Sequence, residues 1–535
     1  MLQRQRFVAV GILLFPILAP SQQSAPPSST PITPRGDQSS YTLKVNSQLV
    51  LLDTVVRDQK GNAVRNLKRD GFTILEDGVP QPISAFEAID TTAPSAERPV
   101  IHSTEELEKT TPNTPVTILV LDELTTRFED EYFARYSLGK YLGAQNKTLS
   151  EPTILLARTY NRTMVLRDYT TSRKEILDAL NRHFVGNAWR ASVPEQASNL
   201  FGAGFASLIE VAKATEGHAG HKNLIWLGRG FPTIEWSNLT ADQAGALQTA
   251  IVSCSNLLRD ARITLYSINP SGISVSREST VDSNGNLPLT DPFAGQIDFD
   301  TIAESTGGIA MHGRNDVDRM IAQAVGNGEV FYSLAYRSAA PSDDDPKKLH
   351  RIKVVMKDPR FIATSRDGYY THNQESVAAL QASGDVSDAR ELDLAGAING
   401  LMVYSGIPLE VARRDKSDQY QITFPAEPLA LEETDGKLTG QIDLIVLSFD
   451  RFGKALSKSG RVISLHLPAL PAGTSENRKV TINATVENTG TAARIRFVMR
   501  AHLTGRIGAE NYFLADRNLL KDPSTGLKVN RSQPK

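Results

Sequence analysis

Few residues in this chain have the types and spacing that metal binding or catalysis requires. His218 and His221 are three positions apart, which could place both imidazoles on one zinc ion, but no third ligand stands nearby in sequence. We therefore interpret them as part of a polar loop. Residues 282–286 carry acidic and amide side chains as a calcium loop does, but they lack its closing Glu and flanking helices, which indicates a turn.

Cys254 is the single cysteine of the chain, so neither a disulfide nor a zinc or iron–sulfur site built from several thiolates can form within it. It follows Leu247 and Ile251 and precedes Leu258 at the spacing of one helical face. We expect a buried core residue at this position rather than a reactive thiol.

The motifs of the common enzyme classes are missing from the sequence. We find no Walker loop, G-x-S-x-G elbow, H-E-x-x-H pair or dinucleotide-binding glycine pattern. A catalytic triad whose members lie far apart in sequence stays open. The 535 residues include 58 Lys and Arg against 60 Asp and Glu, and this near-neutral balance argues against a nucleic-acid-binding protein.

The N-terminus reads as an export signal. Arg4 and Arg6 precede an apolar run over 7–19 that is short for a membrane span, and small residues follow it. We predict a signal peptide over 1–21, with an uncleaved anchor as the alternative, and a disordered Ser- and Pro-rich linker over 22–40. The mature protein is then expected to be soluble and secreted, in the periplasm or outside the cell.

Three folded units are predicted after the linker. Residues 41–90 alternate β-rich runs with turns, which indicates a small β-module. Residues 116–372 alternate apolar strands with amphipathic helices, which is typical of an open, doubly wound α/β sheet. In this scheme the strand at 330–336 closes the α/β unit. Period-2 segments over 400–520 predict a C-terminal β-sandwich, followed by a tail over 521–535.

Several stretches, taken in order, carry a resemblance to one family: 53–64, 70–78, 222–227, 263–270, 303–308 and 368–370. Together they resemble the von Willebrand factor A-related domain of secreted bacterial proteins that is expanded in Acidobacteria. The resemblance spans about 47–371, whereas the C-terminal unit is matched more loosely at 494–496 and 504–508.

The resemblance implies a site at the carboxyl end of the sheet. Domains of this superfamily often hold Mg²⁺ through an Asp-x-Ser-x-Ser loop, a Thr and a second Asp, and a partner's carboxylate completes the coordination. Here Asp122 and Thr126 match the first loop, but Leu124 replaces a hydroxyl ligand. The loop 228–230 offers no Asp, and Asn199 is the nearest candidate for the Thr. We therefore expect a degenerate site and no cofactor, with Mg²⁺ at Asp122 and Thr126 as the alternative.

Arg229 suggests how a degenerate site could be stabilised. If the two loops lie side by side as in the superfamily, its guanidinium could replace the cation and lie within about 4 Å of Asp122. The alternative is a solvent-exposed loop arginine without a role.

The predicted function is a secreted, non-catalytic protein-binding or adhesion-type protein with an envelope partner. The binding residues would be Asp122, Glu123, Thr126, Asn199 and Arg229, in loops at the carboxyl edge of the sheet. Two alternatives stay open: a hydrolytic enzyme on envelope polymers with unrecognised catalytic residues, and a purely structural envelope component.

Overall fold

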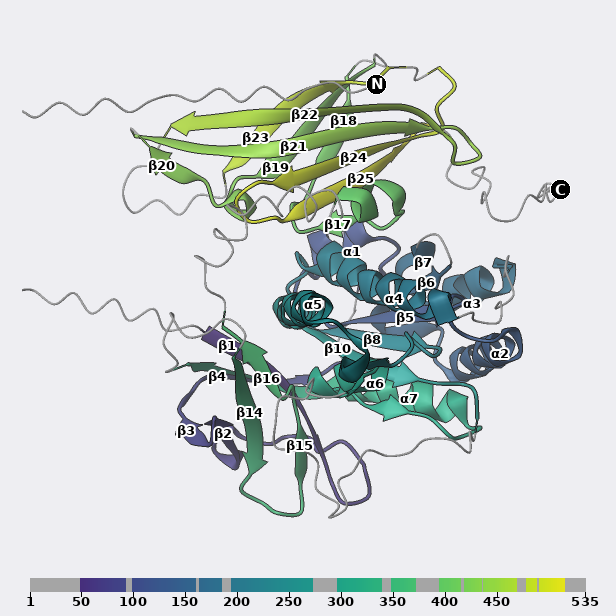
Figure 1. Cartoon of the computed structure of the whole chain (residues 1–535), viewed down its shortest axis with the longest axis vertical. Coiled ribbons are helices and arrows are strands. Elements are labelled where there is room, and N and C mark those ends of the chain that lie inside the picture. Colours follow the sequence, from purple (N-terminus) through teal and green to yellow (C-terminus); the bar gives the residue numbers. More distant parts are fainter. Residues whose placement is uncertain are drawn as a thin grey trace, which may run out of the picture. The chain divides into compact units, whose positions relative to one another are not determined.

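The computed structural model (Figure 1) describes residues 49–92, 99–159, 163–184, 194–272, 296–338, 348–371, 394–414, 418–434, 436–468, 478–487 and 490–514. The predicted signal peptide, linker and tail, and the segment 282–286, lie outside these residues. The described residues form a mixed α/β structure with a six-stranded mixed sheet and several antiparallel sheets. No helix in the described part of the chain is long and apolar enough to cross a membrane.

The six-stranded sheet has the order β12-β10-β8-β5-β6-β7. Its strands are β5 (Val116–Asp122), β6 (Thr148–Arg158), β7 (Thr163–Ser172), β8 (Lys222–Leu227), β10 (Ile263–Ile268) and β12 (Ala310–Met311). All neighbours are parallel except β6 and β7, which are antiparallel. Every residue of β5, β8 and β10 is buried, because helices cover both faces of the sheet.

Two clusters of apolar side chains lie on opposite faces of this sheet. On one face, Leu119 and Leu121 pack with α2 (Phe128–Ala144), α3 (Arg173–Arg182) and α7 (Val317–Glu329). On the other, Ile118 and Val120 pack with α4 (Pro194–Thr215), α5 (Ala241–Asp260) and α6 (Phe299–Ser305). The alternation of side chains along β5 therefore supplies both cores. The prediction of an open α/β sheet covered on both faces is confirmed.

The helix with Cys254 is also as predicted. Thr240 and Gln243 form a reciprocal capping box at the start of α5. Cys254 is 2 % exposed and packs in the same cluster as Ile251 and Leu258. Its assignment to the core is confirmed.

The strand at 330–336 does not close the six-stranded sheet, so this part of the prediction is wrong. It forms β13 (Val330–Arg337), which lies between β1 (Leu49–Arg57) and β4 (Ile83–Asp90) and is antiparallel to both. The remaining strands of this region are β2 (Phe72–Glu76), β3 (Val79–Gln81), β14 (Leu349–Met356), β15 (Ile362–Thr364) and β16 (Gly368–Tyr370). They form the sheets β15-β1-β13-β4 and β16-β14-β2-β3 around a shared core.

Hydrogen bonding explains why the N-terminal strands need the later ones. Strand β13 pairs with both β1 and β4. Without it, the backbone N–H and C=O groups of β1 and β4 that now bond to β13 would have no partner. The apolar run at 330–336 looks the same in sequence whichever sheet it joins.

The C-terminal region consists of antiparallel strands, as its period-2 pattern predicts. One sheet has the order β17-β25-β24-β21-β20, with β22 also paired to β21, and the other has the order β18-β19-β23. The strands are β17 (Tyr404–Ser405), β18 (Glu410–Arg413), β19 (Gln419–Pro425), β20 (Glu432–Thr434), β21 (Lys437–Phe449), β22 (Ala455–Pro468), β23 (Lys479–Thr485), β24 (Arg494–Ala501) and β25 (Ile507–Phe513). Side chains from both sheets share one apolar cluster.

Several short elements lie outside these sheets and the longer helices. They are α1 (Thr104–Thr110), β9 (Ile234–Glu235), β11 (Gln296–Ile297), and single turns of 3₁₀ helix at Arg69–Gly71, Trp236–Asn238 and Glu427–Leu429. Strand β9 pairs with β11 in a two-stranded sheet.

Candidate binding site

The candidate site lies where the order of the six-stranded sheet reverses. From β5 the chain continues to β6 and β7 on one side of that strand, and then returns to β8 on its other side. Open α/β sheets bind ligands at such a reversal, in the crevice outside the carboxyl ends of the strands. Asp122 is the last residue of β5, and the loop containing Gly228, Arg229 and Gly230 follows β8 at the same edge.

Asp122 joins these two loops through hydrogen bonds. Its side chain is buried, at 1 % exposure. One carboxylate oxygen accepts from the backbone N–H groups of Leu124 and Thr125, both at 3.1 Å. The other accepts from the Thr125 hydroxyl at 2.5 Å, from the backbone of Gly230 at 2.9 Å, and from the indole of Trp226 at 3.1 Å.

These contacts leave little room for a metal ion. A carboxylate has roughly four lone-pair positions, and five protein donors already point at Asp122. The Thr126 hydroxyl accepts a hydrogen bond from the backbone of Arg229 at 3.2 Å, and Leu124 is buried where a hydroxyl ligand would stand. The described residues contain no group of three His, Cys, Asp or Glu side chains that could hold a metal. Both oxygens of Asp122 are therefore already engaged by donors of the protein itself.

The predicted ion pair between Asp122 and Arg229 is wrong. Arg229 is exposed, and in the described part of the chain its guanidinium makes no ion pair with Asp122. The loop satisfies the carboxylate with the backbone of Gly230 instead. Burial raises the pKa of Asp122, and its hydrogen bonds with Thr125, Trp226 and Gly230 oppose that rise.

The cation near Asp122 is Arg158, which the sequence analysis missed. Arg158 ends β6 directly beside Asp122 in the register of the parallel strands. Its guanidinium donates to the carbonyls of Thr159 at 2.9 Å and Ala203 at 3.0 Å. Burial lowers the pKa of Arg158, while the charges of Glu210 and Asp122 act in the opposite direction. A charged residue that ends an apolar strand was the available signal in the sequence.

Glu123 faces into the protein rather than toward a partner. Its carboxylate is hydrogen-bonded to Nε2 of His183, and both side chains are nearly fully buried. Glu131 of α2 lies close by, and burial raises its pKa to about 7, with a further rise from the charge of Glu123. Arg135 Nε lies 3.7 Å from the Glu131 carboxylate.

This buried cluster, defined as Glu123, Glu131, Arg135 and His183, fixes the geometry of the first loop. Arg135 donates to the backbone carbonyl of His183 at 2.7 Å, so α2 is tied to the end of α3. Among the described hydrogen bonds, none connects His183 to a serine, threonine or cysteine, so we see no nucleophile activated by it. Sequence reasoning missed the cluster because Glu123, the Glu131–Arg135 pair and His183 lie far apart in sequence, up to 60 positions from one another.

The other predicted residues separate from this site. Asn199 belongs to α4, but its side chain lies outside the described part of the structure. His218 contacts Glu108 at 2.9 Å through Nδ1, and His221 contacts Asp53 at 2.9 Å through Nδ1. The two histidines are buried and bonded to different partners, so they serve as structural links rather than a shared zinc site.

A row of exposed aromatic side chains lies beside the carboxyl edge. Phe128, Tyr132 and Tyr136 recur every four residues along α2 and are 50 %, 65 % and 62 % exposed. Phe184, which follows His183 at the end of α3, is 67 % exposed. We call these four residues the aromatic surface. Their spacing is visible in the sequence, but only the packing of α2 shows that this face points outward.

Comparison with known proteins does not assign the chain. No protein-family model matches it, and no curated protein is significantly similar to it in sequence.

Proposed function

We propose that this chain is a secreted, non-catalytic protein-binding protein of the von Willebrand factor A-like type. In this proposal its C-terminal strands form a β-sandwich that serves as a spacer or further contact surface. The order of the six-stranded sheet and its antiparallel edge strand β7 support the proposed fold type. The position of Asp122 at the reversal of that order supports the proposed location of the binding edge.

The aromatic surface is the observation that carries the proposal. Phe and Tyr side chains are enriched at protein–protein interfaces, and those buried there contribute a large part of the binding energy. Four large aromatic side chains, three on α2 and one directly after α3, are each at least half exposed and are costly to leave in water. A protein partner with complementary apolar side chains would remove this surface from water.

The neighbouring loops would act as a rigid rim. Because Asp122 holds the loop after β8 through protein donors, Arg229 is presented to solvent from a fixed backbone. An exposed arginine adds little affinity by itself, but it favours an acidic rim on the partner. Binding would therefore be independent of divalent cations.

Photo-crosslinking tests this function. The full mature chain with Tyr132→p-benzoyl-phenylalanine is mixed with the envelope fraction of the source organism and irradiated. The matched control carries the same residue at Ile362, which is 60 % exposed on β15. We expect one defined protein adduct from position 132, unaffected by EDTA, and none from position 362.

A second variant guards against nonspecific capture. Phe128→Ser with Tyr136→Ser leaves the crosslinker at position 132 in place but removes its aromatic neighbours, and should abolish the adduct. An adduct that persists in this variant, or one formed equally from position 362, would contradict the proposal.

A further inference from the structure

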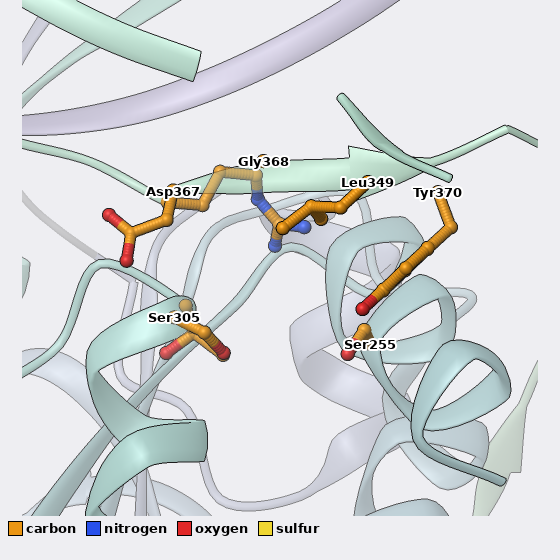
Figure 2. A pocket seen from close by; sticks show the side chains of 8 residues that line it. Ser255, Ser305, Leu349, Asp367, Gly368 and Tyr370 are labelled. Carbon is orange, nitrogen blue, oxygen red and sulfur yellow. The ribbon is translucent and has the colours of Figure 1, made fainter. Parts of the chain in front are cut away.

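A second feature of the protein is independent of the aromatic surface. A small cleft lies between α5, the end of α6 and the strands β14 and β16 (Figure 2). Its lining includes Ser255 of α5, Ser305 at the end of α6, and Arg366, Asp367 and Tyr370 at or beside β16. The cleft therefore lies where helices of the six-stranded sheet meet the antiparallel sheet β16-β14-β2-β3.

Arg366 is the unusual residue of this cleft. Its side chain is partly buried, yet in the described part of the chain no hydrogen bond or ion pair engages its guanidinium. An arginine with several N–H donors removed from bulk water normally has a carboxylate or carbonyl partner. Burial lowers the pKa of Arg366 to about 10, and the positive charge of Arg259 contributes to the decrease.

The two carboxylates whose charges act on Arg366, Asp260 and Asp53, are paired with other cations. Asp260 forms a 2.8 Å ion pair with Arg259. Asp53 is bonded to His221 at 2.9 Å and to Arg262 at 2.7 Å. Arg259 and Arg366 therefore lie near each other, and only Arg259 has a carboxylate paired to it at short range, which leaves a local excess of positive charge.

The two serine hydroxyl groups of the cleft differ in whether their proton is already used in a hydrogen bond. Ser305 donates to the carbonyl of Ile302 at 2.8 Å, so its proton is used within α6. For Ser255, no hydroxyl hydrogen bond is found in the described structure. Figure 2 shows the hydroxyl end of Tyr370 directed toward Ser255, whereas the carboxylate of Asp367 points away from both, on the opposite side of the cleft.

We propose that this cleft is a binding site for one phosphate group, either free or at the end of a larger molecule. The Arg366 guanidinium would bind two of its oxygens side by side, and the Ser255 hydroxyl would donate to a third. Phosphate fits better than a carboxylate because its double negative charge matches the two neighbouring arginines. The bound anion would link β16 to α5.

Thermal unfolding and calorimetry of the full mature chain test this site. Inorganic phosphate is compared with chloride at equal ionic strength, since a ligand that binds the native state raises the melting temperature as its concentration exceeds its Kd. We expect phosphate, and sulfate as a second dianion, to raise the melting temperature by several degrees, and acetate to have a smaller effect. The calorimetric Kd should weaken about tenfold in Ser255→Ala, the loss expected for one hydrogen bond to a charged group.

Arg366→Gln should abolish the phosphate-dependent shift. Arg360→Gln is the matched control, because Arg360 is 74 % exposed and already paired with Asp358 in a nearby turn. This variant should keep the full shift. If Arg366→Gln does not fold, Arg366→Lys keeps the charge but loses the two-pronged contact, and should bind phosphate more weakly than the native chain.

The Kd of phosphoethanolamine, a phosphate monoester, shows whether the site takes free phosphate or a phosphate group at the end of a larger molecule. Binding as tight as that of inorganic phosphate indicates a terminal phosphate on a larger molecule, and much weaker binding indicates the free ion. Equal melting temperatures in phosphate and chloride, or an equal phosphate effect in the native chain and in Arg366→Gln, would overturn the proposal.

Discussion

The carboxylate of Asp122 accepts a hydrogen bond from the backbone N–H of Gly230 at 2.9 Å. This contact joins the end of β5 to the loop after β8, the two segments that flank the reversal of the sheet. A buried carboxylate is stable only when its charge is compensated. Here neutral donors from the backbone, a hydroxyl and an indole provide most of that compensation at short range.

Removing the Asp122 side chain should destabilise the whole edge. Asp122→Ala leaves five donors without their acceptor, and each buried donor without a partner costs about 1–3 kcal/mol. After partial relaxation we expect a loss of about 3–5 kcal/mol in the free energy of unfolding, measured with urea. The control Asp178→Ala on α3 removes a partly exposed carboxylate that pairs with Lys174, and should cost far less. A loss below about 1 kcal/mol for Asp122→Ala would show that the hydrogen bonds to Asp122 contribute little to stability.

Magnesium should not stabilise the protein. Since the oxygens of Asp122 are engaged by protein donors, we expect Mg²⁺ not to bind there, and a cation that does not bind the native state cannot shift its unfolding. The melting temperature should be the same in millimolar Mg²⁺ and in EDTA. A rise with Mg²⁺ that EDTA reverses would restore the metal-binding alternative.

Gly228 should tolerate no side chain. Its φ is +153°, and an added Cβ would overlap Cβ of Asp122 and Oγ1 of Thr126. Gly228→Ala should therefore lower stability by about 2–4 kcal/mol, a value typical of overpacking combined with backbone strain.

Gly245→Ala is the control, because Gly245 lies on the exposed face of α5 with nothing within 4 Å of an added Cβ. It should instead stabilise by up to about 1 kcal/mol. Similar effects of the two variants would contradict the described loop contact.

Glu131 should make stability depend on pH. Its native pKa of about 7 lies above the value of 4.5 expected in the unfolded chain, so the native state holds the proton more tightly. Its contribution to stability is therefore complete below about pH 4.5 and is lost as pH rises through about 7. The shift corresponds to about 3 kcal/mol at most.

Comparison of variants isolates this effect from other titrating groups. Relative to the native chain, Glu131→Gln should be increasingly stabilised as pH rises from 5 to 8, by roughly 2–3 kcal/mol in total. Glu123, Arg135 and His183 face Glu131 and stay in place in this variant. Glu129→Gln alters an exposed carboxylate on the same helix and should run parallel to the native curve. A constant difference between native chain and Glu131→Gln across this range would contradict the prediction.

Cys254 should react slowly with thiol reagents. It is 2 % exposed, and burial raises the pKa of its thiol to about 12, so little thiolate exists near neutral pH. Native labelling should proceed only through unfolding, with a rate that increases with denaturant. Rapid labelling without denaturant, in a protein that keeps its native circular dichroism, would show that α5 does not pack as described.

Local patterns in the sequence were sufficient for much of the fold. The apolar runs that became β5, β8 and β10 indicate strands buried on both faces, because only a sheet covered by helices on both sides buries consecutive side chains. The position of Cys254 followed from helical periodicity alone. Such features depend on residues within a few positions of each other.

Pairing and contacts across the fold required the tertiary structure. Strand β13 satisfies the hydrogen bonds of β1 and β4, and nothing in its own residues reveals which sheet offers it an open edge. Arg158, rather than Arg229, lies beside Asp122 because parallel register aligns the ends of β5 and β6. The sequence by itself determined the strands, helices and core positions, since short-range periodicity encodes burial. The partners of Asp122 and Glu131 and the surroundings of Arg366 were decided only by packing, which brings together charges that no local pattern relates.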